Sequence, residues 1–145
     1  MKISAKTEYA CIAILELAAC YETGGPVQVR KIAERHAVPS RFLVQIMLQL
    51  KAAGLVASTR GAAGGYRLAV PPEEITLGQV MDIIEGNQPS ETGFSLSGSP
   101  DSPAVRVLAQ TWQEVQEKEK EMLSSITFAE LLERARQYES QMYYI

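Results

Sequence analysis

A proline between two amphipathic segments constrains the fold of this chain more than any other feature. Before it, Val29, Ile32 and Ala33 recur at helical spacing. Pro39 disfavours helical geometry at Val38 but suits the first turn of a new helix. After it, a second apolar run has the same spacing: Phe42, Leu43, Ile46, Met47 and Leu50. The sequence therefore predicts two short helices joined by a tight turn.

A glycine-rich hairpin is predicted directly after the second helix. Gly54 stands where a helix-ending glycine would stand. Residues 55–58 and 66–70 are short β-prone runs, and the turn RGAAGG at residues 60–65 separates them. The two glycines before Tyr66 let the backbone bend sharply and approach another backbone. Helix, turn, helix and hairpin in this order indicate a winged helix-turn-helix, whose second helix lies in the DNA major groove. The alternative is a small helical core with a surface hairpin and no ligand.

The start of the second helix carries the candidate DNA-reading side chains. Arg41 suits bidentate binding of guanine, Gln45 suits adenine, and Val44 suits a thymine methyl group. Other interpretations are a phosphate contact for Arg41, a solvated Gln45 and a helix N-cap for Ser40. Arg60, at the hairpin tip, is expected to meet the minor groove or phosphate. Side chains at the start of the first motif helix are expected to bind phosphate. The predicted DNA-binding set is Gln28, Arg30, Ser40, Arg41, Val44, Gln45, Arg60, Gly61, Gly64, Gly65 and Tyr66.

Charge is divided unevenly between the two halves of the chain. Residues 1–70 hold nine Lys or Arg and four Glu, a charge of +5, whereas residues 71–145 hold five Lys or Arg and thirteen Asp or Glu, a charge of -8. The whole chain carries -3. A basic front and an acidic rear orient a protein on a polyanion. Charges scattered over solvated faces would give a smaller split, so the asymmetry favours a nucleic acid as the partner.

The longest predicted helix, residues 104–125, carries an apolar seam. The seam positions alternate in steps of three and four, with Glu119 filling one of them. Such a seam suggests that two of these helices cross in a homodimer. The alternative is a single helix packed on its own domain. The predicted dimer residues are Val105, Leu108, Trp112, Val115, Met122 and Ile126.

Together these segments predict a mainly α protein with a small β-hairpin, built as a winged helix-turn-helix domain plus a long dimerisation helix. A first helix is expected over residues 3–21, with Ser4 or Thr7 as its cap. Another helix is expected after the capping residue Thr76. The expected units are a DNA-binding domain at 1–86, a flexible loop at 87–103, and the dimerisation and C-terminal helices at 104–145.

Three stretches of the chain resemble the Rrf2 family of bacterial transcription regulators. They are MKISAKTEYACIAILELA at residues 1–18, RKIAERHAVPSRFLVQIMLQLKAAGLV at 30–56, and STRGAAGGYRLAVPPEEITLGQVMDIIEG at 58–86. The resemblance resumes near SITFAEL at 125–131. It implies a regulator, most simply a homodimeric repressor, that reads double-stranded DNA with the start of the second motif helix and with the hairpin arginine. The position of Val44 is often Glu or another polar residue in the family, which leaves the target sequence open.

An iron–sulfur cluster is the cofactor that this resemblance raises. Many relatives carry three closely spaced cysteines in the region of residues 87–103, because thiolates hold cluster iron. This chain has two cysteines, Cys11 and Cys20, both in the first expected helix. They lie on opposite faces of that helix, so they cannot pair within it, and core packing is favoured over redox sensing. Glu8 matches a carboxylate ligand of some relatives and is interpreted as a surface charge. No cluster and no other cofactor is expected.

Other classes of function find less support in the sequence. The single histidine, His36, cannot build a metal site and is interpreted as a helix-end residue near phosphate or solvent. No nucleophile with a base at readable spacing occurs, so no enzyme is expected. Neither a signal-type run nor an apolar stretch of about 18 residues occurs, so no membrane partner is expected and the protein is placed in the cytoplasm.

The expected function is therefore sequence-specific DNA binding by a transcription regulator. The alternative is a protein-interaction module on the same fold that has lost specific DNA reading, which the acidic rear half and Val44 motivate. A small-molecule or protein effector is left open for the loop at residues 87–103.

Overall fold

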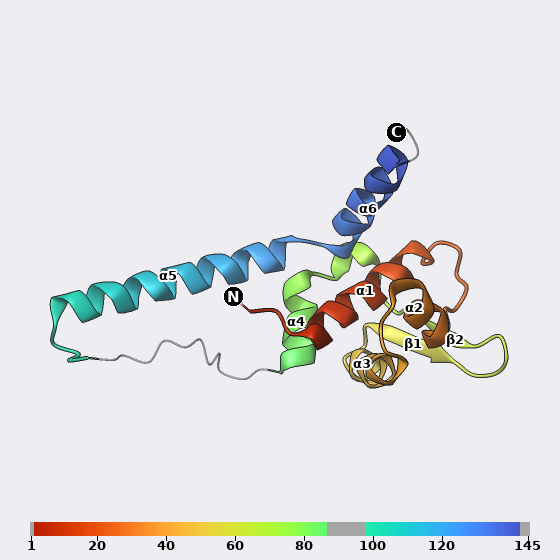
Figure 1. Ribbon diagram of the computed structural model, residues 1–145, viewed down its shortest axis with the longest axis horizontal. Coiled ribbons are helices and arrows are strands. Elements are labelled where there is room, and N and C mark those ends of the chain that lie inside the picture. Colours follow the sequence, from red (N-terminus) through yellow and green to blue (C-terminus); the bar gives the residue numbers. More distant parts are fainter. Residues whose placement is uncertain (1, 87–97, 143–145) are drawn as a thin grey trace.

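The computed structural model describes residues 2–86 and 98–142. Within that part of the chain, helices dominate and one two-stranded antiparallel sheet is present, so the expected fold class is confirmed (Figure 1). The elements in chain order are α1 (Ala5–Ala19), α2 (Val29–His36), α3 (Ser40–Ala52), β1 (Val56–Thr59), β2 (Gly65–Leu68), the 3-10 helix η1 (Pro72–Glu74), α4 (Leu77–Glu85), α5 (Pro103–Ser125) and α6 (Phe128–Met142).

The first helix is shorter than the expected span 3–21. It begins at Ala5 because Ser4 is its N-cap, and the Ser4 hydroxyl accepts a hydrogen bond from the Thr7 amide at 3.2 Å. Thr7, the other candidate cap, is buried instead and its hydroxyl donates to Glu85 Oε1 at 3.0 Å. This bond ties the start of α1 to the end of α4.

The turn between α2 and α3 forms where Pro39 predicted a break. Ala37 adopts a left-handed conformation with φ of 53° and ends α2. The Val38 amide donates to the Ala33 carbonyl at 3.1 Å, and the Val38 side chain is buried. Pro39 is the N-cap of α3. The turn is therefore anchored by one apolar side chain, which fixes α3 relative to α2.

The hydrophobic core lies between α1, α3 and α4 and is closed by the start of α6. Fully buried side chains from each of these helices meet there, for example Ile14 of α1, Met47 of α3, Val80 of α4 and Phe128 of α6. Burial of each such side chain contributes about 1.5–3 kcal/mol. The C-terminal helix thus supplies part of the core of the unit expected at residues 1–86.

A main-chain bridge holds the start of α6 against the start of α4. The Leu77 amide donates to the Ile126 carbonyl at 3.0 Å, and the Phe128 amide donates to the Ile75 carbonyl at 2.9 Å. Ile126 directly follows the last residue of α5, and its backbone is extended. The predicted seam consequently continues on α5 itself only as far as Met122.

The long helix α5 extends away from the rest of the molecule, and α6 projects from the body on another side (Figure 1). None of the side chains of α5 is buried in the single chain. Of the segment expected as a loop, residues 87–97 lie outside the described residues. Residues 98–102 lead into α5 through a turn, in which the Pro100 carbonyl accepts a bond from Arg106 Nε at 2.8 Å.

Candidate nucleic-acid interface

The outer face of α3 presents the side chains that the sequence predicted to be exposed. Arg41, Val44 and Gln45 are all exposed, as is Ser40 at the first helical position. The opposite face is fully buried through Leu43, Ile46, Met47 and Leu50. Because Pro39 is the N-cap, Ser40 does not cap α3, and that alternative interpretation is wrong. The start of α3 is free to meet a partner.

Arg41 rests on an aromatic pair. Its Cζ atom lies 5.0 Å from the centroid of the Phe42 ring, and that ring lies 6.1 Å from the ring of Tyr9 on α1. The sequence placed Phe42 in the apolar face of the helix, yet its side chain is 38% exposed. The cation–π contact favours one orientation of the guanidinium. Tyr9 of α1 thus packs against the Phe42 ring that holds the Arg41 guanidinium at the start of α3.

The hairpin is shaped by its glycines. A Cβ atom at Gly64 would stand 2.2 Å from the Thr59 carbonyl oxygen, so only glycine fits this turn. Gly65 has a φ of +154°, and a Cβ there would lie 2.5 Å from the Val27 carbonyl oxygen. The sharp bend and the close backbone approach expected for these two glycines are both observed. Arg60 is exposed beside them, at the hairpin turn.

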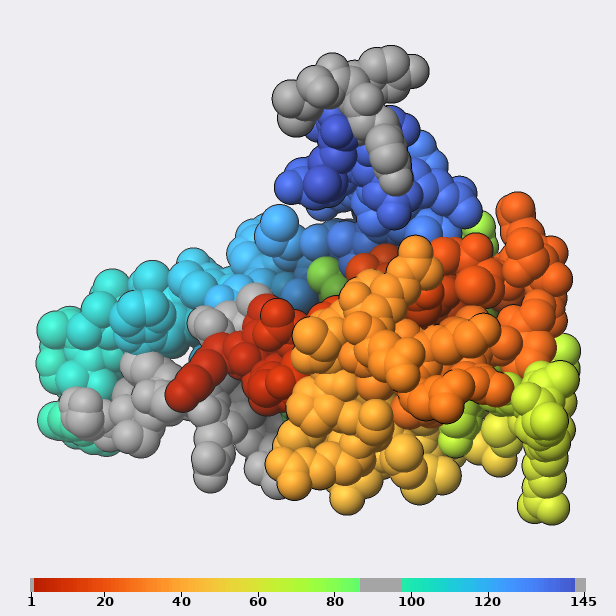
Figure 2. All heavy atoms as spheres, turned by 45° about the vertical axis from the view of Figure 1, so that its right-hand side comes forward, coloured from red at the N-terminus to blue at the C-terminus, as the bar shows by residue number. Residues whose placement is uncertain are grey.

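The strand β2 is attached on both sides. It pairs with β1 in the register Val56–Leu68 to Thr59–Gly65. On its other side, Tyr66 exchanges two main-chain hydrogen bonds of 2.8 Å with Val27, the residue that precedes α2 by two positions. Tyr66 is half-buried against the core. Gly65 and Tyr66 therefore fix the hairpin beside α2, where it stands out from the body (Figure 2).

Side chains at the start of α2 and at the end of α3 also contact the hairpin. The side-chain amide Nε2 of Gln28 donates to the Ala62 carbonyl at 3.3 Å, so this predicted phosphate ligand contacts the hairpin turn. Lys51 Nζ donates to the Ser58 hydroxyl at 2.7 Å. Arg30 lies 3.9 Å from Glu34 in an exposed pair, which leaves its guanidinium largely solvated. α2, α3 and the hairpin form one face (Figure 2).

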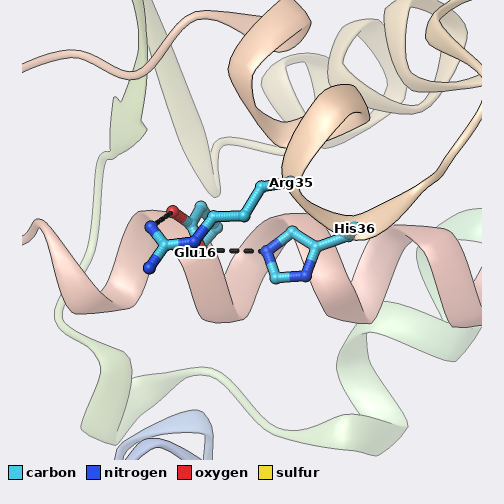
Figure 3. Close-up of polar contacts among 3 residues, drawn as sticks. All are labelled: Glu16, Arg35 and His36. Carbon is cyan, nitrogen blue, oxygen red and sulfur yellow. Dashed lines mark hydrogen bonds and ion pairs between the residues drawn. The ribbon is translucent and has the colours of Figure 1, made fainter.

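An ionic cluster that the sequence did not reveal joins α1 to α2. Glu16 accepts a bond from Arg35 Nη1 at 2.8 Å and lies 3.0 Å from His36 Nε2 through its other oxygen (Figure 3). The Glu16 side chain is only 14% exposed. His36 is the last residue of α2, as expected, but its partner is this carboxylate rather than phosphate or solvent alone. The partners are 19 and 20 residues apart, so no local spacing could have predicted them.

The two cysteines are both free and half-buried. Burial, and more weakly the charge of Glu8, raise the pKa of the Cys11 thiol from 9.0 to about 11. A thiol of this kind is protonated at neutral pH and therefore a weak metal ligand. Among residues 2–86 and 98–142, no group of three or more His, Cys, Asp or Glu side chains could hold a metal ion. Of the thiolates that hold cluster iron, this chain can supply at most two, those of Cys11 and Cys20.

The arrangement defines a class of protein. A helix-turn-helix with an exposed second helix, followed by a hairpin held beside it, is a winged helix-turn-helix, and its partner is DNA. The sequence profile of the Rrf2 family, described as iron-dependent transcriptional regulators, matches residues 3–134. The chain belongs to the Rrf2 family.

Individual members of the family match over nearly the whole chain. A putative HTH-type transcriptional regulator of Synechocystis is 36% identical and covers 97% of this chain and 93% of its own. The regulator CymR of Bacillus subtilis is 35% identical over the full length of both chains. The structure of CymR, described as the global cysteine regulator of that organism, has a TM-score of 0.75, with 92% of this chain and 98% of that chain covered. IscR of T. potens has a TM-score of 0.74 at 35% identity, with coverages of 93% and 88%.

These findings make the protein a DNA-binding transcription regulator and not an enzyme. The alternative, a protein-interaction module without specific DNA reading, is not favoured, because the relatives are HTH-type regulators. Within the described part of the chain, no helix is both long and apolar enough to cross a bilayer.

Proposed function

We propose that this protein is a homodimeric repressor that reads a two-fold symmetric DNA site with the start of α3 and with the hairpin. The observation that carries the proposal is the single surface formed by the exposed tip of α3 and a hairpin held against the α2 side by the Val27–Tyr66 bridge. The major groove admits the helix, and the adjacent minor groove or phosphates meet the hairpin tip. Occupation of a promoter by such a dimer blocks transcription.

Within this surface, the predicted residues take three roles. Arg41, Val44 and Gln45 read base edges, while Ser40, Arg30 and Arg60 contact phosphate or the minor groove. The remaining predicted residues shape and place the hairpin: Gln28, Gly61, Gly64, Gly65 and Tyr66. The proposed reading surface is thus smaller than the complete predicted set.

The dimer is proposed to form through α5. Its seam residues Leu108, Trp112, Val115 and Met122 are strongly exposed in the single chain, with Trp112 at 49% and Met122 at 66%. Val105 is half-buried. A stripe of exposed apolar side chains on a helix that extends from the body (Figure 1) marks an interaction surface. A second copy of α5 offers the matching stripe, because seam residues at steps of three and four interdigitate.

No iron–sulfur cluster is proposed for this protein. Its two cysteines fall short of the four ligands that such a cluster takes, and both lie on or next to α1. Regulation then comes from another signal, which we propose to be a small molecule or a protein that changes the geometry of the reading surface. Because its target is chromosomal DNA, the protein is proposed to act in the cytoplasm.

Substitution of single arginines tests the proposed reading surface. Arg41→Ala and Arg60→Ala should each weaken binding to the operator by about 1–3 kcal/mol, measured by fluorescence anisotropy with a labelled duplex. Arg136→Ala is the matched control, because Arg136 is exposed on α6, away from that surface. Equal affinity of Arg41→Ala, Arg60→Ala and Arg136→Ala would rule out the proposed surface.

A further inference from the structure

An open hollow of about 610 Å³ lies beside the helix-turn-helix, between the end of α1, the turn that follows it and one face of α2. The side chains that matter for its chemistry are Glu16, Cys20, Val27, Lys31, Glu34 and Arg35. Its volume is within the range of about 300–1,000 Å³ that is typical of small-molecule sites. The hollow is separate from the outer face of α3.

The hollow presents charges of both signs in equal number. Lys31, Glu34 and Arg35 are spaced three and four residues apart, so they share one face of α2. The carboxylate of Glu16 is already engaged by Arg35 and His36. Of the five N–H groups of Arg35, only one, on Nη1, is used in this contact. The lining therefore retains guanidinium donors for an anionic group.

Two further charged groups in the hollow are available to a ligand. The Lys31 ammonium has neither a hydrogen bond nor an ion pair with any of the residues that the structure describes. Among the described residues, the Glu34 carboxylate has only the long, exposed contact of 3.9 Å with Arg30. A carboxylate suits Lys31 and the spare donors of Arg35, and an ammonium group suits Glu34. A molecule that carries both groups matches the hollow better than a simple anion, which Glu34 would repel.

One wall of the hollow is connected directly to the DNA-binding hairpin. Val27 lines the hollow, and its N–H and C=O groups are both bonded to Tyr66 of β2 at 2.8 Å. A displacement of Val27 therefore either moves β2 or breaks two hydrogen bonds. The opposite wall is α2, whose turn places α3. A ligand in the hollow would thus contact Val27, which is bonded to β2 of the hairpin, and α2, which is joined to α3 by the turn.

We infer that this hollow binds a small zwitterionic metabolite, of which a free α-amino acid is the simplest kind, and that its occupancy changes the position of the hairpin. The effect on gene regulation rests on the proposed function, since a displaced hairpin matters only if the hairpin contacts DNA. Binding in the hollow does not depend on DNA. The two can therefore fail separately.

Cys20 provides a direct probe of occupancy, because its half-buried thiol lines the hollow, whereas Cys11 does not. The full-length protein would be treated with iodoacetamide alone or with single L-amino acids, with cysteine omitted because it consumes the reagent. Modification of each thiol would be followed separately by peptide mass spectrometry. A matching amino acid should slow modification of Cys20 about tenfold at a concentration of about ten times its Kd, with Cys11 unchanged.

Variants of Lys31 assign this protection to the hollow. Lys31→Ala should abolish the protection of Cys20, and Lys31→Arg should retain it, because the cation is kept. Succinate and putrescine, which carry charge of one sign only, should not protect. Failure of every amino acid tested would overturn the inference, and so would protection that persists in Lys31→Ala. Equal protection by succinate would overturn the zwitterionic class.

The effect on DNA is measured in a second experiment with the protecting amino acid. Operator affinity should change by about 5–150-fold in the wild-type protein and not in Lys31→Ala. Protection of Cys20 without any change in operator affinity would overturn the coupling to the hairpin. Loss of DNA binding by the wild type in all conditions, with Cys20 still protected, would instead count against the proposed function alone.

Discussion

At the scale of single residues, the position of the hairpin depends on a glycine that has no room for a side chain. In Gly65→Ala, the new Cβ would meet the Val27 carbonyl oxygen at 2.5 Å in a strained backbone conformation. We expect a loss of about 1–3 kcal/mol in stability and weaker operator binding, because the Val27–Tyr66 bridge must open. Urea denaturation and anisotropy measure the two effects. Gly25→Ala, where a Cβ meets nothing within 4 Å, is the control, and equal behaviour of both variants would contradict the account.

The thiol of Cys11 offers a second prediction at this scale. Because burial and Glu8 raise its pKa to about 11, the reactive thiolate should be scarce at neutral pH. The rate of modification by iodoacetamide should increase about tenfold per pH unit from pH 8 and level off near pH 11, as long as the fold persists. Peptide mass spectrometry across this pH range measures it. A plateau already near pH 9 would show that the protein does not perturb this thiol.

At the scale of secondary-structure elements, the first residue of α6 joins the C-terminal part to the DNA-binding part. Phe128 is fully buried in the core. Phe128→Ala should reduce the free energy of unfolding by about 3–5 kcal/mol, since it leaves a cavity among α1, α4 and α6. Tyr138→Ala, in the same helix but 66% exposed, is the control and should change it little. Thermal and urea unfolding compare the two variants, and similar losses would contradict the placement of α6.

The order and boundaries of these elements were largely predictable from the sequence, because they follow from local signals. Pro39, Gly54 and the capping residue Thr76 act on their immediate neighbours, and each stands where a helix begins or ends. The Thr76 hydroxyl accepts a hydrogen bond from the Gln79 backbone amide at 3.2 Å, as expected of a capping residue. The exposed start of α3 followed from its periodicity for the same reason.

The contacts between elements were not predictable in this way. The Glu16 cluster, the support of Arg41 by Phe42 and Tyr9, and the bridge between Ile126 and Leu77 all join residues that are distant in sequence or depart from the simple helical pattern. The sequence of a single chain carries no signal for such pairs. For the same reason, the hollow between α1 and α2 became apparent only in three dimensions.

At the scale of the whole molecule, α5 is proposed to form the dimer. Trp112→Asp places a charge in the middle of the apolar seam and should give a particle of one chain, 15.9 kDa, in analytical ultracentrifugation. Gln113→Asp is the control, because this exposed neighbour lies outside the seam, and it should leave the dimer intact. A monomeric wild-type protein, or a Trp112→Asp variant that stays dimeric, would contradict the proposed seam.

Charge is divided unevenly over the whole molecule. The basic residues lie mainly in the half of the chain that contains α1 to β2, whereas residues 71–145 carry an acidic excess of -8, of which -2 lies in α4, -1 in each of α5 and α6, and -4 outside these three helices. A dimer joined through α5 would hold two basic reading surfaces apart on a frame of α4, α5 and α6 that carries a charge of -4 per chain. Such a frame is repelled by phosphate, which favours approach of the reading surfaces to DNA.

Selection of bound duplexes from a random DNA pool by the purified wild-type protein tests the central claim most directly. A homodimer that reads DNA with α3 and the hairpin should enrich a two-fold symmetric site. Its half-sites should be centred about 34 Å apart, or a multiple of that, because each α3 enters a successive major groove on the same side of the duplex. Enrichment of such a site is the result that the structure predicts. Enrichment of an asymmetric site, or of no site, would contradict the account of a symmetric, sequence-reading dimer.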